Sequence, residues 1–62
     1  MNPIIASFGN FCLDNEIAIG WHGERLGVLV VNGKLIRAKD VRRLYRDWHK
    51  SFADICQQIG AI

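Results

Sequence analysis

Basic side chains are concentrated in a short stretch of the second half of the chain, and six of them form a candidate binding set: Lys34, Arg37, Lys39, Arg42, Arg46 and His49. The last four follow one another at steps of three and four, which places them on one flank of a helix. Arginine and lysine bind phosphate and carboxylate groups. The flank therefore predicts an anion-binding surface, for a nucleic acid or for an acidic protein. The alternative is that these cations keep a small hydrophobic protein soluble while their stems cover apolar edges.

A second set of charges on the same stretch alternates in sign and needs no partner. Its members recur at steps of three and four, where neighbours on a helix can pair at about 0.2–0.5 kcal/mol each. They are Asp40, Arg43, Asp47, Lys50 and Asp54. This set predicts a solvated ladder of ion pairs.

Cysteine and histidine offer little metal chemistry. Cys12, His22, His49 and Cys56 are the only such side chains, and they lack the short paired spacings of zinc sites. We expect no metal and two reduced, buried thiols, since free cysteine commonly packs as a small hydrophobe. A disulfide between Cys12 and Cys56 is the alternative that the sequence leaves open.

Catalytic machinery is also scarce. His22 and Glu24 stand on either side of Gly23 and would meet in a tight turn, but polar residues at turn tips are usually only solvated. The sequence carries no nucleophile elbow and no glycine-rich phosphate loop. The prediction is a protein that is not an enzyme and holds no cofactor.

Length and composition favour a protein that binds a partner. Sixty-two residues, half of them hydrophobic, make one small domain over residues 1–62. A chain of this size buries only about 60% of the surface that its unfolded form exposes, so we expect a homodimer. The net charge of +2 is mild and argues against an acidic mimic of DNA. No export signal or bilayer-spanning run is recognisable, which predicts a cytoplasmic protein without membrane contact.

The first half of the chain, residues 1–37, is predicted to be rich in β-structure. Asn32-Gly33 between apolar runs favours a type I′ hairpin, in which Val31 pairs with Lys34 and Val28 with Arg37. A second hairpin is expected to turn at Gly23-Glu24. The sheet then has three strands; residues 4–8 would add a strand or a cover, which the sequence does not decide.

The two predicted hairpins assign the faces of the sheet. One face would carry the larger apolar side chains and form the core: Ile17, Ile19, Trp21, Leu26, Val28, Val30 and Leu35. The other face includes Leu29, Val31 and Ile36 and is also apolar, although an antiparallel sheet with one wet face should alternate. We expect this second face to be covered by the N-terminal segment or by another subunit, which makes Leu29, Val31 and Ile36 a candidate oligomer face.

One long amphipathic helix is predicted over residues 38–59. Its apolar stripe follows the i, i+3, i+4 spacing and comprises Val41, Leu44, Tyr45, Trp48, Phe52, Ile55, Cys56 and Ile59. Gly60 would end it. On this stripe Tyr45 and Trp48 would face the core and be poorly placed to stack on bases.

The fold class that follows is α+β: a small antiparallel meander of three, or with the N-terminal segment four or five, strands packed on one long C-terminal helix. The favoured function is a small non-enzymatic protein that modulates or inhibits a larger protein complex by stoichiometric contact, of the kind carried by phages and mobile elements. This rests on size and lack of chemistry, an associational argument. The alternative is a dimeric DNA- or RNA-binding module that uses the basic flank.

Overall fold

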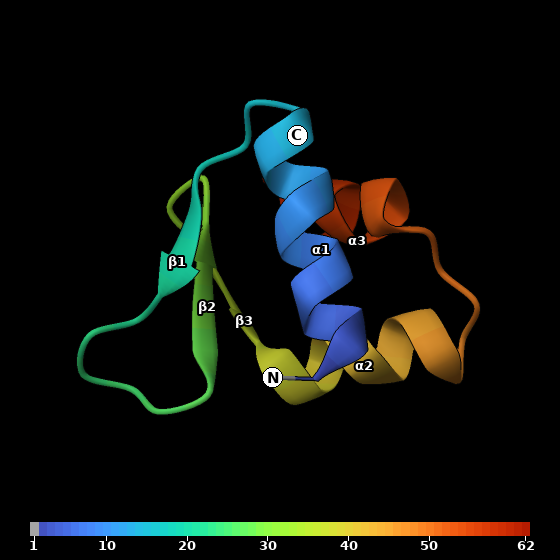
Figure 1. Cartoon of the computed structure of the whole chain (residues 1–62), viewed down its shortest axis with the longest axis horizontal. Coiled ribbons are helices and arrows are strands. Elements are labelled where there is room, and N and C mark those ends of the chain that lie inside the picture. Colours follow the sequence, from blue (N-terminus) through green and yellow to red (C-terminus); the bar gives the residue numbers. More distant parts are fainter. Residues whose placement is uncertain (1) are drawn as a thin grey trace.

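The computed structural model describes residues 2–62 and has an α+β architecture (Figure 1). The elements are α1 (Pro3–Asp14), β1 (Ile19–Trp21), β2 (Val28–Val31), β3 (Lys34–Arg37), α2 (Ala38–Arg46) and α3 (Phe52–Gln58). The strands form one three-stranded antiparallel sheet in the order β1-β2-β3. The predicted class is confirmed, whereas a fourth or fifth strand is absent from residues 2–62.

The N-terminal segment is a helix, which corrects the prediction that residues 1–37 are mainly β-structure. Asn2 caps α1 by accepting the Ile4 N–H on its side-chain oxygen at 2.9 Å. Pro3 follows at the first helical position, where its fixed φ suits the helix. Ile5, Phe8 and Cys12 then recur at steps of three and four and form the buried stripe of α1.

The β2–β3 hairpin has the predicted turn and register. Asn32 and Gly33 both take positive φ, at 46° and 80°. Val31 pairs with Lys34 and Val28 with Arg37. The two-residue turn leaves no slack between the strands, so the turn alone determined the pairing.

The β1–β2 register differs from the prediction by three residues. Ile19 pairs with Val31 rather than with Val28. The strands are joined by the loop 22–27 instead of a two-residue turn at Gly23-Glu24. Within this loop, His22 Nδ1 accepts the N–H groups of Glu24 and Arg25 at 3.1 Å each. An odd shift turns the other face of β1 toward the same side.

The predicted assignment of the sheet faces is wrong in part: Ile17 and Val28 are buried as expected, but the second face also lies in the core. Leu29, Val31 and Ile36, the candidate oligomer face, are buried in the core of the single chain. Helices of the same chain cover them, so this face is not available to another subunit. By contrast Leu26 and Leu35, expected in the core, are exposed.

The single helix predicted over residues 38–59 is two helices with a turn between them. His49 takes a left-handed φ of 55°, and Lys50 N–H donates to the Leu44 carbonyl at 3.0 Å, which ends α2. A capping box then starts α3: Ser51 Oγ accepts the Asp54 N–H at 3.1 Å, and the Asp54 carboxylate accepts the Ser51 N–H. Gly60, at φ 78°, follows α3 as predicted.

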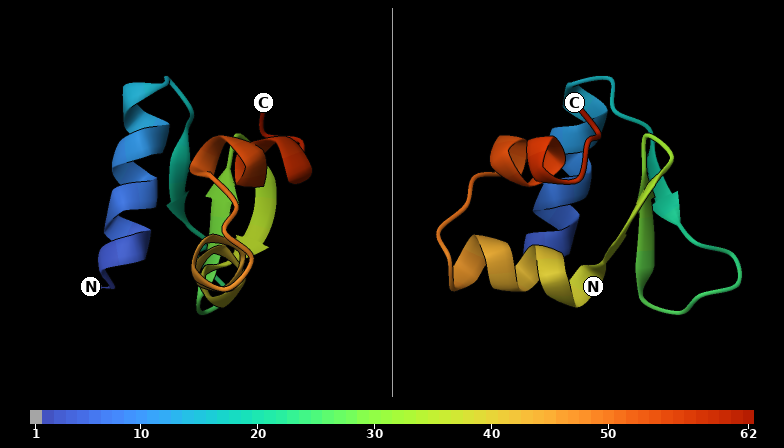
Figure 2. Two further views of the ribbon diagram at one scale, coloured as in Figure 1. Left: turned by 90° about the vertical axis from the view of Figure 1, so that its right-hand side faces the viewer. Right: turned by 180° about the vertical axis from the view of Figure 1, so that it is seen from behind.

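All three helices lie on one side of the sheet (Figures 1 and 2). In the left panel of Figure 2, α2 and α3 lie in front of β2 and β3, whereas α1 stands outside β1. The core between them includes fully buried Phe8, Val31, Val41 and Ile55. Phe52 joins the helices through ring contacts with Phe8 of α1 at 5.4 Å and with Tyr45 of α2 at 4.4 Å between centroids.

Within residues 2–62, no helix combines the length and the apolar character that crossing a bilayer requires.

Candidate binding surface

The six basic side chains singled out in the sequence do not form one patch. Lys34 lies at the turn end of β3, near Gly60. Arg37, Lys39 and Arg42 gather at the start of α2, and Arg46 and His49 lie at its other end. Of the predicted flank, Lys39, Arg42 and Arg46 follow one another at steps of three and four within α2, whereas His49 lies beyond the end of this helix.

At the start of α2 the basic side chains border a groove that also contains exposed apolar groups. We name it the Trp21 groove; its lining is Trp21, Leu26, Gly27, Arg37, Ala38, Lys39 and Arg42. Trp21 is 52% exposed and Leu26 is fully exposed. Leu26 stands next to Gly27, which takes a positive φ of 73° where the loop 22–27 enters β2. The loop therefore carries a large apolar side chain into solvent beside three cations.

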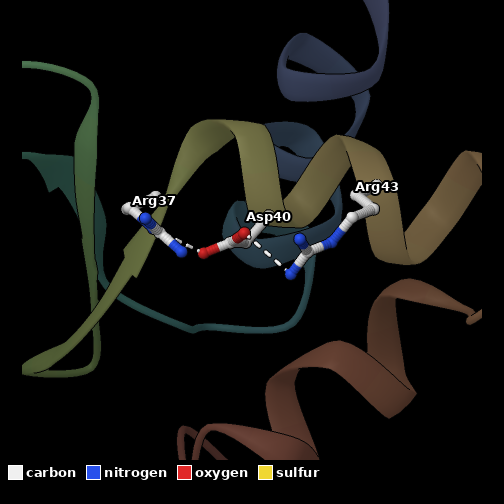
Figure 3. Close-up of polar contacts among 3 residues, drawn as sticks. All are labelled: Arg37, Asp40 and Arg43. Carbon is white, nitrogen blue, oxygen red and sulfur yellow. Dashed lines mark hydrogen bonds and ion pairs between the residues drawn. The ribbon is translucent and has the colours of Figure 1, made fainter.

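Arg37 is fixed in this groove by an acidic side chain of α2 (Figure 3). Its Nε donates to Asp40 Oδ2 at 2.7 Å, and the other oxygen of Asp40 forms an ion pair with Arg43 at 3.0 Å. The Asp40–Arg43 pair was predicted as part of the charge ladder. Asp40 also lies in the first turn of α2, where a negative charge favours the helix dipole. Lys39 and Arg42 take part in no ion pair within residues 2–62.

A second groove lies at the other end of α2. We name it the α2-end groove; it is lined by Tyr45, Arg46, His49, Lys50 and Ser51. Arg46 Nε donates to Asp47 at 3.0 Å, and this hydrogen bond lowers the pKa of the Asp47 carboxyl from its ordinary value. The charge ladder predicted that Asp47 pairs with residues three and four positions away, whereas its ion pair is with the adjacent Arg46.

Tyr45 and Trp48 are exposed, which corrects the expectation that they face the core. Trp48 is 65% exposed and follows the end of α2, while one face of Tyr45 stacks on Phe52. The predicted apolar stripe continued past residue 47 only because the apolar residues kept a helical spacing across the turn between α2 and α3. The aromatic side chains nearest the α2-end groove are therefore at the surface.

The two thiols are buried together in the core, Cys12 on α1 and Cys56 on α3. Both are free, and each thiol affects the pKa of the other. Burial, with the neighbouring Cys56, raises the pKa of Cys12 to about 12. A thiol so far from ionisation is a poor nucleophile at neutral pH.

His22 is engaged within its own loop, because Nδ1 accepts the N–H groups of Glu24 and Arg25. Among residues 2–62 no group of three histidine, cysteine, aspartate or glutamate side chains is arranged to hold a metal ion.

Sequence reasoning assigned the basic residues of the Trp21 groove but placed Trp21 and Leu26 in the core. Two glycines within the loop, Gly23 and Gly27, are the sequence signal that could have removed Trp21 and Leu26 from the predicted core. They permit a longer connection than a two-residue turn. Comparison of the chain with protein-family models, with curated proteins and with solved structures finds no significant match.

Proposed function

We propose that this chain is a small non-enzymatic binding protein that modulates or inhibits a larger protein by stoichiometric contact through the Trp21 groove. The observation that supports it is the half-exposed Trp21 beside fully exposed Leu26 and the cations of α2. Tryptophan and arginine are the residues most enriched among those that dominate binding energy at protein interfaces. A phage or mobile-element inhibitor of a host complex remains the biological setting that we favour.

The surroundings of Trp21 suit an anchor. The guanidinium of Arg37 is held by Asp40, so one wall of the groove is ordered before any partner arrives. Pre-organised side chains lose less conformational entropy on binding, which strengthens the contact. Lys39 and Arg42, free of ion pairs within residues 2–62, would attract an acidic rim on the partner and raise the association rate.

Site-specific photo-cross-linking tests this proposal. A photoreactive amino acid replaces Leu26 in one preparation and Gln58, an exposed residue of α3, in a matched control. We expect a cross-link to one defined protein of the host extract from position 26 alone. The isolated complex should have a fixed stoichiometry by light scattering, and Trp21→Ala should weaken it about tenfold or more. Equal cross-linking from both positions, or a complex indifferent to Trp21→Ala, would reject the Trp21 groove.

A second candidate function is nucleic-acid binding, which the exposure of Tyr45 and Trp48 beside Arg46, His49 and Lys50 favours. Proteins that bind single strands combine a basic groove with aromatic side chains on which bases stack. In this groove Arg46 is already paired with the carboxylate of Asp47, which weakens the argument for nucleic-acid binding.

The homodimer also stays a proposal, with a different surface. Val30 and Leu35 lie on the sheet face away from the helices and are partly exposed. Light-scattering mass of the wild type and of Leu35→Lys tests it: a dimer that becomes monomeric on this substitution would assign that face, and a monomeric wild type would exclude the dimer.

A further inference from the structure

The outer edge of β1 has backbone groups that point away from the sheet. At the ends of this strand Asn32 N–H donates to the Ala18 carbonyl at 2.7 Å, and His22 N–H donates to the Val28 carbonyl at 2.8 Å. Because hydrogen-bonded and non-hydrogen-bonded pairs alternate along an antiparallel ladder, Gly20 bonds across to β2. Ile19 and Trp21 on either side of it direct their N–H and C=O groups outward. Within residues 2–62 no strand pairs with this edge.

The two edges of the sheet differ in how they are protected. β3 begins at Lys34 and ends at Arg37, and charged side chains on an edge strand discourage pairing with another chain. β1 consists of Ile19, Gly20 and Trp21 and carries no charge. Of the two edges, β1 is the one without charged side chains to discourage pairing with another chain.

An apolar groove runs along this edge beneath α1. Ile5, Gly9 and Leu13 line it from the helix, and Ile19 and Trp21 line it from the strand. Because α1 stands outside β1 (Figure 2, left), this helix overhangs the place that a fourth strand would occupy. Leu13 is 66% exposed, and a Cβ added at Gly9 would meet no atom within 4 Å. The groove thus has room for side chains from another chain.

We propose that the outer edge of β1 binds one extended segment of a partner protein, which adds a fourth strand with an apolar side chain in the groove beside Leu13. Trp21 also lines the Trp21 groove, so the two grooves meet at this residue. Lys39 and Arg42 lie at that end of the edge. The segment that fits is therefore apolar along the edge and acidic where it passes Trp21. Strand addition supplies affinity through backbone hydrogen bonds and specificity through alternate side chains.

A second copy of this chain fits the edge less well than a single segment. Antiparallel pairing of β1 with another β1 about a twofold axis would place both α1 helices on the same side of the joined sheet. Each α1 already extends beyond its own β1 (Figure 2, left), so the two helices would compete for the same space. A segment with no helix of its own avoids this conflict.

The inference rests on the proposed function and defines the partner's chemistry: an extended, apolar and acidic segment. A display library of random peptides of about nine residues, long enough to span β1, is selected on the full chain. The same library is counter-selected on Gly9→Leu, which fills the groove. Leu13→Lys is a second variant that places a charge at the groove mouth, where a cation suits the end of α1. Lys50→Ala, on the α2-end groove, is the matched control.

The expected result is a set of peptides that alternate apolar with other residues and carry acidic residues at one end. Gly9→Leu and Leu13→Lys should each weaken their binding about tenfold or more, and Lys50→Ala should leave it unchanged. In hydrogen exchange, bound peptide should protect the amides of Ile19 and Trp21. Failure to enrich such peptides over the Gly9→Leu counter-selection, or a bound peptide that leaves both amides unprotected, overturns the inference.

The same variants separate this inference from the proposed function. If the partner captured through position 26 depends on Trp21 but tolerates Gly9→Leu, the chain binds proteins through the Trp21 groove and strand addition is wrong. If peptides bind along β1 while no stoichiometric complex depends on Trp21, the edge is a binding site and the proposed function is wrong.

Discussion

The side-chain nitrogen of Asn32 donates to the carbonyl oxygen of Ala61 at 2.8 Å, so the hairpin turn is tied to the end of the chain. The oxygen of the same amide accepts the Ala18 N–H at 2.8 Å. One side chain in a turn therefore joins the segment before β1, the β2–β3 hairpin and the segment after α3. In a domain with a small core, this link holds together regions that are far apart in the sequence.

Asn32→Gly should keep the turn and lose this link. Glycine accepts the positive φ of this position at least as well as asparagine. Two hydrogen bonds disappear, each worth about 0.5–1.5 kcal/mol net, so we expect unfolding to become easier by about 1–3 kcal/mol in urea. Asn32→Asp keeps an oxygen that accepts the Ala18 N–H, but its second oxygen would face the Ala61 carbonyl, which is also an acceptor. This variant should therefore also destabilise the fold. Unchanged midpoints in both variants would show that the amide contributes nothing.

The pair of buried thiols predicts a loss of stability in alkali. The pKa of Cys12 rises from 9.0 to about 12 in the folded chain. Between these pH values the folded state keeps a proton that the unfolded state releases, so the stability supplied by Cys12 is complete below about pH 9 and is lost as pH rises toward 12. The slope attributable to one such group is at most about 1.4 kcal/mol per pH unit.

Urea unfolding across this range, for the wild type and for Cys12→Ala, isolates the effect. Alanine leaves a small cavity and should lower stability at every pH, but the free energy of unfolding should fall less steeply above pH 9 than in the wild type. The side chains other than the two thiols are common to both chains, so their contributions cancel. Parallel pH profiles would show that Cys12 ionises as freely in the folded chain as in the unfolded one.

The break between α2 and α3 depends on the capping box at Ser51. Ser51→Ala removes the acceptor for the Asp54 N–H and should destabilise the protein by about 1 kcal/mol. Ser7→Ala in the middle of α1 is the matched control: Ser7 is exposed, and alanine is the better helix former there, so that variant should be neutral or slightly stabilised. Thermal unfolding followed by circular dichroism compares them. Equal midpoints would mean that the turn after α2 is set without this cap.

The sequence was most informative where one local signal determined the geometry. Asn32-Gly33 determined the β2–β3 register because a two-residue turn allows no alternative. Asn2-Pro3 before the stripe of Ile5, Phe8 and Cys12 is an equally local signal for α1, and it was overlooked.

The β1–β2 register could not be obtained in this way, because hydrogen bonds to His22 shape a loop that no turn motif describes. Trp21 and Leu26 were consequently assigned to the core, and the Trp21 groove was missed. The basic residues stay candidates, and the single helix over residues 38–59 was wrong because the apolar periodicity continued across the turn at residues 47–51. Burial of Val41 and Ile55 fits one continuous helix as well as two, so the stripe could not reveal the break.

Salt dependence decides between the two candidate functions. If the α2-end groove binds a nucleic acid, affinity for a single-stranded oligonucleotide should fall steeply with salt. Trp48→Ala should weaken binding by about 1–3 kcal/mol, the usual contribution of a stacked base. Lys50→Ala should reduce the slope of log affinity against log salt by about one contact. Trp21→Ala, in the other groove, should change neither the affinity nor its salt slope.

Fluorescence anisotropy of a labelled oligonucleotide at about 50 and 200 mM salt measures both the affinity and its salt slope. An oligonucleotide that fails to bind at the lower concentration would exclude the nucleic-acid function, because release of counterions is then at its most favourable and Tyr45 and Trp48 are already exposed.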